Sequence, residues 1–122
     1  VLAVQTVPRE LTKQYGIVEV NGEHEKCPTI RSIVEKPDPQ VAPSTMAVIG
    51  RYVLEPEIFD SLRKIDRGAG GEIQLTDAIA REIPKGKTVA CKYDGERFDC
   101  GSKQGFLNAT VHYARKEGYR II

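Results

Sequence analysis

Three short stretches of the sequence place charged or flexible residues where a ligand could bind. The first contains Glu35 and Lys36, which end an apolar stretch and directly precede Pro37. A carboxylate accepts hydrogen bonds from sugar hydroxyls, and a lysine ammonium pairs with phosphate as a point charge. The pair therefore suits a sugar phosphate. The alternative interpretation is a solvated strand end that carries two unrelated charges.

The backbone around this pair is predicted to bring both side chains to one place. Pro37 disfavours a helical conformation at the preceding residue, so we expect an extended backbone at Lys36. In open α/β sheets, ligands bind in the crevice beyond the strand ends. We therefore expect Glu35 and Lys36 to reach into a cleft at the end of their strand.

The second stretch is "GAGGE", Gly68 to Glu72, which we predict at the start of a helix. Free backbone N–H groups at a helix start can bind an anion. The stretch lacks the lysine and the spacing of a P-loop, and it does not match the dinucleotide-binding fingerprint. A plain loop is the alternative interpretation.

The third stretch is "RFDCGSK", Arg97 to Lys103. Asp99 is predicted to end a short strand, and Gly101 allows a tight turn into a helix capped by Ser102. A strand-end carboxylate beside a helix N-terminus can hold Mg²⁺ while the helix faces phosphate. The alternative is a turn-forming aspartate that accepts a hydrogen bond from the nearby backbone.

The composition narrows the class of protein. The chain has 122 residues, 29% of them charged, and a net charge of +1, which indicates one globular domain at most. Interleaved charges of both signs argue against a nucleic-acid-binding face or a polybasic membrane anchor. No apolar run approaches the roughly 18 residues of a membrane span, and we expect no signal peptide.

The three cysteines are predicted to be reduced, half-buried thiols of a cytoplasmic protein, because they are odd in number and form no C-x-x-C pair. A zinc site is the sharper alternative. It is disfavoured because His24 and His112 lie at no ligand spacing to the cysteines, which are Cys27, Cys91 and Cys100.

The elements predicted to position these stretches alternate between strands and helices. The Asn21-Gly22 pair predicts a tight hairpin turn within a hairpin that runs from Tyr15 to Glu35, with strands over residues 15–20 and 28–35. Helices are predicted over residues 56–65 and 71–83 from their apolar stripes. The remaining predictions are strands over 1–7, 45–54 and 87–95, and a last helix that ends at Gly118 and buries Phe106, Leu107, Val111 and Ala114.

Taken together and in this order, the motifs resemble those of the sugar nucleotidylyltransferase family. "VEKP" is shared across the family, whereas "GAGGEIQLTDAI" and "DCG" resemble the branch of bacterial UTP–glucose-1-phosphate uridylyltransferases. The resemblance covers nearly the whole chain. It implies an α/β fold: the C-terminal half of a Rossmann-like nucleotidyltransferase, with a mixed sheet and flanking helices.

The resemblance also implies roles for individual residues. The backbone at Gly16 would approach the sugar ring, and Glu35 would bind glucose hydroxyls. Lys36 would bind the phosphate of glucose-1-phosphate and act as a catalytic residue. Asp99 would be the second catalytic residue, as one of two aspartates that hold Mg²⁺. The implied ligands are UTP, glucose-1-phosphate and UDP-glucose, and the implied assembly is a homo-oligomer, a dimer or a tetramer.

Two departures from the family pattern affect the finer specificity. Ser102 stands where the family usually has an aspartate, and Thr45 stands where it usually has an asparagine. The family's N-terminal nucleotide-binding half, with its "GxGTR" loop and the other metal-binding aspartate, is not found in this sequence. We therefore expect residues 1–122 to be a fragment that has no turnover by itself.

Two other classes of function stay open. One is a nucleotidylyltransferase that uses a thymidine, guanosine or adenosine triphosphate, or another sugar phosphate. The other is a non-catalytic module that binds a sugar phosphate or drives oligomerisation. An exposed sheet edge favours self-association of strands.

Overall fold

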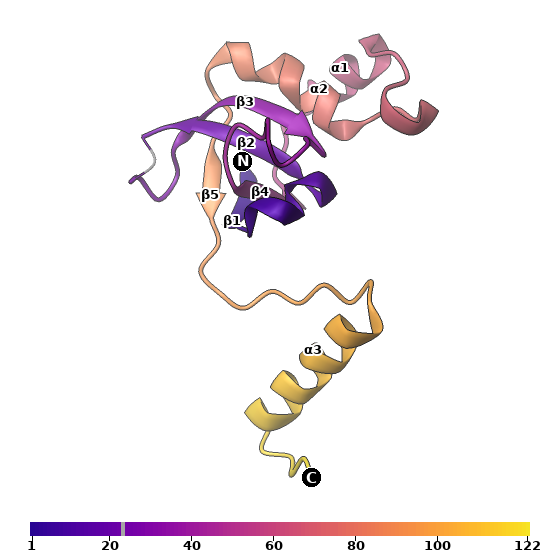
Figure 1. The fold of residues 1–122 in the computed structure, drawn as a ribbon. Coiled ribbons are helices and arrows are strands. Elements are labelled where there is room, and N and C mark those ends of the chain that lie inside the picture. Colours follow the sequence, from indigo (N-terminus) through magenta and orange to yellow (C-terminus); the bar gives the residue numbers. More distant parts are fainter. Residues whose placement is uncertain (23) are drawn as a thin grey trace.

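The structure is a computed structural model that describes residues 1–22 and 24–122. Its centre is a five-stranded sheet with the order β3-β2-β4-β1-β5 (Figure 1). β5 runs parallel to β1, and the other neighbouring strands are antiparallel. The predicted α/β class with a mixed sheet is therefore confirmed. The strands are β1 (Leu2–Thr6), β2 (Gly16–Asn21), β3 (Thr29–Glu35), β4 (Met46–Tyr52) and β5 (Ala90–Lys92).

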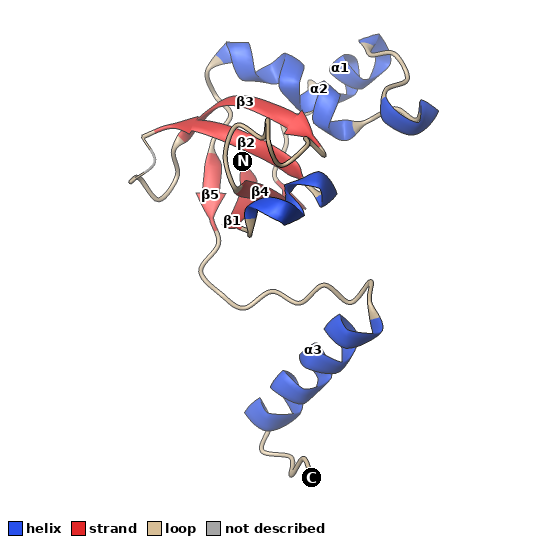
Figure 2. Cartoon of the chain, in the orientation of Figure 1, coloured by secondary structure: helices blue, strands red, loops and turns tan. Residues whose placement is uncertain are grey.

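The α-helices that the apolar stripes predicted are present, with shorter bounds (Figure 2). They are α1 (Ile58–Lys64), α2 (Leu75–Glu82) and α3 (Lys103–Lys116). Short 3-10 helices join the elements: η1 (Arg9–Gln14), η2 (Ala69–Gly71) and η3 (Ile83–Lys85). No helix of the described residues is long and apolar enough to cross a lipid bilayer.

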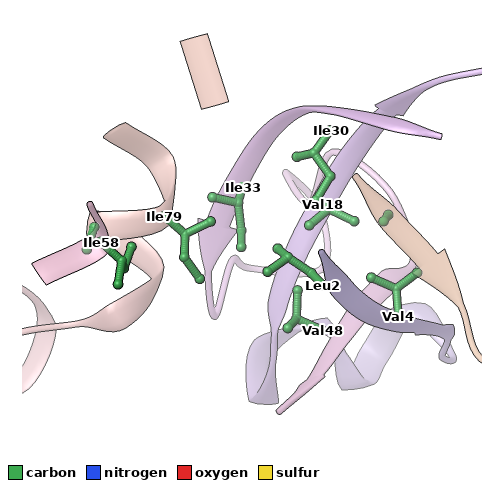
Figure 3. Packing of buried hydrophobic residues seen from close by; sticks show 10 residues of the cluster. Leu2, Val4, Val18, Ile30, Ile33, Val48, Ile58 and Ile79 are labelled. Carbon is green, nitrogen blue, oxygen red and sulfur yellow. The ribbon is translucent and has the colours of Figure 1, made fainter. Parts of the chain in front are cut away.

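The main core lies between the sheet and the helix pair α1–α2. Ile79 of α2 lies beside Ile33 of β3, and Ile58 of α1 lies on the far side of Ile79 from the sheet (Figure 3). The side chain of Ile79 is 1% exposed, so it fixes α2 against the sheet. Burying such a side chain stabilises the fold by about 1.5–3 kcal/mol. The first turn of α2 is thereby held near the end of β3.

The predicted hairpin is confirmed, but its tight turn is wrong. Asn21 still pairs with Thr29 inside the ladder, so the connection spans residues 22–28 and is not a two-residue turn. The backbone carbonyls of Lys26 and Pro28 accept hydrogen bonds from β5. These bonds commit part of the connection to a different strand, which explains why the chain does not reverse at Asn21-Gly22.

The predicted strand over 87–95 is reduced to three residues, and Asp99 does not end a strand. Residues 93–102 instead form an irregular segment between β5 and α3. Within this segment, the ring centroid of Phe98 lies 5.0 Å from that of His112 on α3. The segment is therefore anchored on α3 at one end and on the sheet at the other.

The predicted burial of one face of α3 is wrong. The helix stands apart from the sheet (Figure 1), and none of its residues is buried. Phe106 is 63% exposed and Leu107 is 53% exposed. Its ends do match the prediction: the Ser102 hydroxyl accepts a hydrogen bond from the Gly105 N–H at 3.0 Å, and Gly118 follows the helix with a positive φ.

Candidate functional site

Gly16 and Glu35 meet at one end of the β2–β3 hairpin. They are opposite each other in the antiparallel ladder, as the first residue of β2 and the last of β3. A Cβ atom at position 16 would lie 3.2 Å from the Glu35 Oε2 atom, closer than most such contacts. The missing side chain of Gly16 therefore leaves room for the Glu35 carboxylate, as the pairing of these two predicted residues requires.

Thr76, in the first turn of α2, holds the same carboxylate. Its hydroxyl donates a hydrogen bond of 2.5 Å to Glu35 Oε2. No local sequence pattern singles out Thr76, although it lies inside the "GAGGEIQLTDAI" motif that carries the resemblance. The motif pointed to the right helix, but only the packing of α2 against β3 shows which of its side chains reaches Glu35.

A cleft of about 360 Å³ opens beside these residues. The Tyr52 side chain enters it from β4, and its pKa is raised, first by partial burial and then by the Glu35 carboxylate. The cleft thus combines a carboxylate, a hydroxyl and an aromatic ring, which suits a polyhydroxy ligand. Its lining also includes Gln14, Tyr15, Gly16, Val48, Ile49, Gly50, Gln74, Leu75, Thr76 and Arg97.

Lys36 lies next to Glu35 and is not part of the cleft lining. Its Nζ is 4.0 Å from Glu35 Oε1, and its side chain is 60% exposed. At this distance and with the ammonium exposed, the pair contributes little to stability. The ammonium is therefore available to a ligand that extends from the cleft toward solvent.

The backbone prediction for Lys36 is wrong. Its φ is +46°, which makes it the one non-glycine residue with a positive φ in the part of the chain that the structure describes. The Lys36 N–H donates a hydrogen bond of 2.9 Å to the Tyr15 carbonyl. This bond extends the hairpin ladder and outweighs the extended preference imposed by Pro37. Strained backbone of this kind costs on the order of 1–3 kcal/mol and concentrates at functional sites.

Arg97, which the sequence reasoning assigned no role, reaches the cleft from the irregular segment. Its guanidinium carbon lies 5.3 Å from the centre of the Tyr15 ring, and its Nη1 is 3.4 Å from the Tyr15 hydroxyl. Its Nη2 is 3.9 Å from Asp99 Oδ2. Arg97 therefore adds a cation to the cleft and connects the cleft to Asp99.

Asp99 itself adopts the alternative predicted for it, a turn. Its Oδ1 accepts a hydrogen bond of 2.9 Å from the Gly101 N–H, and its side chain is 59% exposed. No group of three His, Cys, Asp or Glu side chains in the described residues could hold a metal ion. Among the described residues, Asp99 is therefore a candidate ligand that belongs to no group of three such side chains.

The glycine stretch does not open a helix as predicted. Gly68 precedes the short η2, and α2 begins only at Leu75, after an extended backbone at Glu72 and Gln74. The N–H groups of the glycines therefore do not form the first turn of α2. The structure favours the plain-loop interpretation of this stretch.

The three cysteines are free, and none of them belongs to a group of three potential metal ligands among the described residues. The prediction of half-buried thiols holds for Cys91 alone, because Cys27 and Cys100 are exposed. The exposed positions follow from their elements: one lies in the β2–β3 connection and the other in the irregular segment before α3.

Curated proteins that are similar to this chain include several that share one name. A UTP--glucose-1-phosphate uridylyltransferase of Komagataeibacter xylinus is 52% identical over 103 residues, which are 84% of this chain and 36% of the relative. A protein of the same name from Pseudomonas aeruginosa is 44% identical over 110 residues, which are 90% of this chain and 39% of the relative. The chain thus spans well under half the length of these relatives.

Two solved structures that are similar to this chain have names related to those of the curated proteins. A UDP-glucose pyrophosphorylase complexed with UDP-glucose superposes with a TM-score of 0.88 at 37% identity, covering 94% of this chain and 44% of that one. A UTP-bound UGPase from Acinetobacter baumannii gives a TM-score of 0.78 at 41% identity, covering 94% and 39%. The profile of the family described as nucleotidyl transferase matches residues 1–116. The chain therefore belongs to the nucleotidyl transferase family.

Proposed function

We propose that this chain is the sugar-phosphate-binding part of an enzyme that makes UDP-glucose and pyrophosphate from UTP and glucose-1-phosphate. The names of the relatives support this activity. The observation that carries it is the cleft in which Gly16, Glu35 and Thr76 meet. Because the relatives are more than twice as long, we propose residues 1–122 as the C-terminal part of a Rossmann-like domain whose nucleotide-binding half lies N-terminal to it.

The proposed reaction is an in-line displacement at phosphorus. A phosphate oxygen of glucose-1-phosphate attacks the α-phosphorus of UTP, and the bond to the β-phosphate breaks, so pyrophosphate leaves. No covalent intermediate with the protein is needed. The protein accelerates such a step mainly by positioning two anions and by offsetting their repulsion.

The residues of the cleft would divide this task. Glu35 would accept hydrogen bonds from the glucose hydroxyls, held in place by the Thr76 hydroxyl. Gly16 would let the backbone approach the sugar ring. Lys36, exposed beside Glu35, would pair with the sugar phosphate as a catalytic cation. An ammonium–phosphate contact at about 4 Å is worth up to roughly 4 kcal/mol at an effective dielectric of 20, before desolvation.

The involvement of Mg²⁺ is implied by the family resemblance. Asp99 would provide one ligand, and the described residues do not supply the rest. The Arg97 guanidinium already lies near the Asp99 carboxylate, so a metal ion would have to compete with this cation. The roles of Glu35, Lys36 and Gly16 do not depend on the metal. A cytoplasmic location and a homo-oligomeric assembly likewise stay predictions.

The test is synthesis from a panel of substrates by the full-length protein. Each of UTP, dTTP, GTP and ATP is incubated with glucose-1-phosphate or another hexose-1-phosphate, and the nucleotide sugar is quantified by chromatography. We expect UTP with glucose-1-phosphate to give the highest kcat/KM. A preference for another nucleotide or sugar would identify a different sugar nucleotidylyltransferase. If no pair turns over while UDP-glucose still binds, the non-catalytic module is the correct interpretation.

A further inference from the structure

Two of the three cysteines lie directly opposite each other on neighbouring backbone segments. The Ala90 N–H donates to the Pro28 carbonyl at 2.9 Å, and the Lys92 N–H donates to the Lys26 carbonyl at 3.1 Å. These bonds make residues 26–28 an antiparallel partner of β5. Thr29 and Val89 continue the same register as an antiparallel bridge.

The register places Cys27 and Cys91 between the two hydrogen-bonded pairs. Directly opposed residues at such a non-hydrogen-bonded position have Cα atoms about 4.5 Å apart and side chains on the same face of the sheet. Disulfides require Cα atoms separated by about 4.4–6.8 Å. The register therefore implies a Cα separation near the lower end of the range that a disulfide accepts, and we expect the bond to close without a change in strand pairing.

The two thiols also interact and differ in access. Cys91 is the main reason that the pKa of the Cys27 thiol is raised, and desolvation is the second, as expected for two thiols that face each other. Cys27 is exposed and Cys91 is half-buried. Neighbouring Lys26 forms an ion pair of 3.1 Å with Asp94, and its charge acts on the Cys27 thiol in the opposite direction.

We propose that Cys27 and Cys91 form a reversible dithiol–disulfide site that is oxidised by a peroxide. Cys27 is the thiol that an oxidant in solution reaches, and Cys91 is the resolving thiol behind it. This assignment is independent of the proposed nucleotidyl transfer. The disulfide would tie the β2–β3 connection to β5, the strand that leads into the segment carrying Arg97.

The chemistry with hydrogen peroxide is balanced in two steps. The Cys27 thiolate attacks one peroxide oxygen, the O–O bond breaks and hydroxide leaves, so Cys27 becomes a sulfenic acid. The Cys91 sulfur then attacks the Cys27 sulfur, the S–S bond forms, and the S–O bond breaks with release of the second oxygen as water. In total, two thiols and one peroxide give one disulfide and two waters, and the two sulfurs lose the two electrons that the peroxide gains.

The test is a peptide map of the purified full-length protein after exposure to hydrogen peroxide. Free thiols are alkylated, and the protein is digested with trypsin without reduction. Cleavage after lysine and arginine isolates each cysteine in its own peptide, residues 27–31, 88–92 and 98–103. We expect peptides 27–31 and 88–92 to be recovered as one disulfide-linked species that dithiothreitol separates.

Two variants make the assignment specific. Cys100→Ser is the matched control and should leave the linked species unchanged. Cys91→Ser should abolish it and leave Cys27 as a sulfenic acid that dimedone captures. Oxidation should also raise the thermal midpoint of the wild-type protein by about 5 °C or more, since the link closes a long loop, and this rise should be absent in Cys91→Ser.

Either of two results would overturn the proposal. One is recovery of peptide 27–31 linked to 98–103 or to a second molecule. The other is that Cys27 and Cys91 are both alkylated as free thiols after the peroxide treatment, while the small dithiol dihydrolipoate, treated in the same way, is converted to its disulfide.

Discussion

The Glu35 carboxylate is the side chain around which the other residues of the site are arranged. Thr76 donates to it from α2, and the Lys36 ammonium lies 4.0 Å from its second oxygen. Gly16 faces it from the paired strand. Each neighbour is held by a different element, so the position of this one carboxylate depends on the β2–β3 hairpin and on α2 together.

Gly16→Ala tests the need for space beside this carboxylate. The added Cβ would lie 3.2 Å from Glu35 Oε2, so the carboxylate has to move by a few tenths of an ångström. We expect a loss of stability of about 1–3 kcal/mol and a rise of about tenfold or more in the KM for glucose-1-phosphate. Steady-state kinetics and urea denaturation measure the two effects. An unchanged KM would show that the close fit of residue 16 has no role in sugar binding.

Lys36→Ala and Lys36→Gly form a matched pair, because both remove the ammonium and only one relieves the backbone. The lost charge-assisted hydrogen bond to phosphate should lower kcat/KM in both variants by about 10- to 100-fold. Glycine accepts the φ of +46° without strain. Lys36→Gly should therefore be more stable than Lys36→Ala by up to about 1 kcal/mol.

Kinetics and denaturant unfolding of the two Lys36 variants decide both points. Wild-type kcat/KM in either variant would remove the ammonium from the mechanism. A glycine variant that is less stable than the alanine variant would contradict the backbone argument.

The sequence predicted part of this site, and the limits have physical causes. The family resemblance pointed to Gly16 and Glu35, and the hairpin register brings these two residues together. Thr76 and Arg97 reach the cleft through packing between elements far apart in the chain, which no local pattern encodes. The φ of Lys36 was missed for a similar reason, since the bond to the Tyr15 carbonyl overrides the local preference set by Pro37.

At the scale of elements, α1 and α2 are joined by a polar contact as well as by their apolar faces. The Ser61 hydroxyl on α1 donates a hydrogen bond of 2.5 Å to Glu82 Oε1 on α2, and the Lys85 ammonium lies 2.5 Å from Glu82 Oε2. The pKa of Glu82 is lowered, first by its bond with Lys85 and second by its bond with Ser61. Both bonds therefore favour the ionised form of Glu82.

Glu82→Gln should therefore change how stability varies with acid. A carboxyl whose folded pKa is lowered contributes stability above its ordinary pKa of 4.5, and this contribution is lost as the pH falls through the folded value. We expect the variant to be less stable than wild type at pH 7 and to lose less stability below about pH 4.5.

Urea unfolding at a series of pH values measures this difference. Ser61→Ala, which removes only the second cause of the shift, should give a smaller change of the same sign. Parallel pH profiles of the wild type and Glu82→Gln would contradict the role assigned to the ionised carboxylate.

Element types were predictable from the sequence, whereas bounds and burial were less so. The apolar stripe of α2 predicted which face of the helix is buried. The structure confirms this, since Ala78 and Ile79 are fully buried. The start of α2 was placed too early because the glycines of the preceding loop allow extended as well as helical backbone. The apolar face of α3 led to a prediction of burial that is wrong. Hydrophobic periodicity shows that a helix has an apolar face, but it does not show which part of the protein covers that face.

At the scale of the whole molecule, α3 carries exposed apolar side chains, including Phe106, Leu107 and Tyr113. In the described part of the chain, no element of the sheet packs on this helix. An exposed apolar surface of this kind is typical of a contact with another part of a protein or with another subunit. It is consistent with the predicted homo-oligomer, whose interface the structure does not contain.

Light scattering coupled to size-exclusion chromatography of the full-length protein checks the assembly. We expect a mass of two or four subunits that does not change on moderate dilution. The mass of a single subunit at all concentrations would contradict the prediction, and α3 would then be expected to pack within one subunit.

The central claim is that the cleft beside Glu35 binds the glucose moiety, and two carboxylates of the same hairpin allow a matched test. Glu19 lies on β2, where its carboxylate is bonded to Arg31 and Ser32, and it does not line the cleft. Isothermal titration calorimetry of the full-length protein with UDP-glucose should give a Kd about tenfold or more weaker for Glu35→Gln and a wild-type Kd for Glu19→Gln. Equal affinities for the wild type and Glu35→Gln would contradict the account.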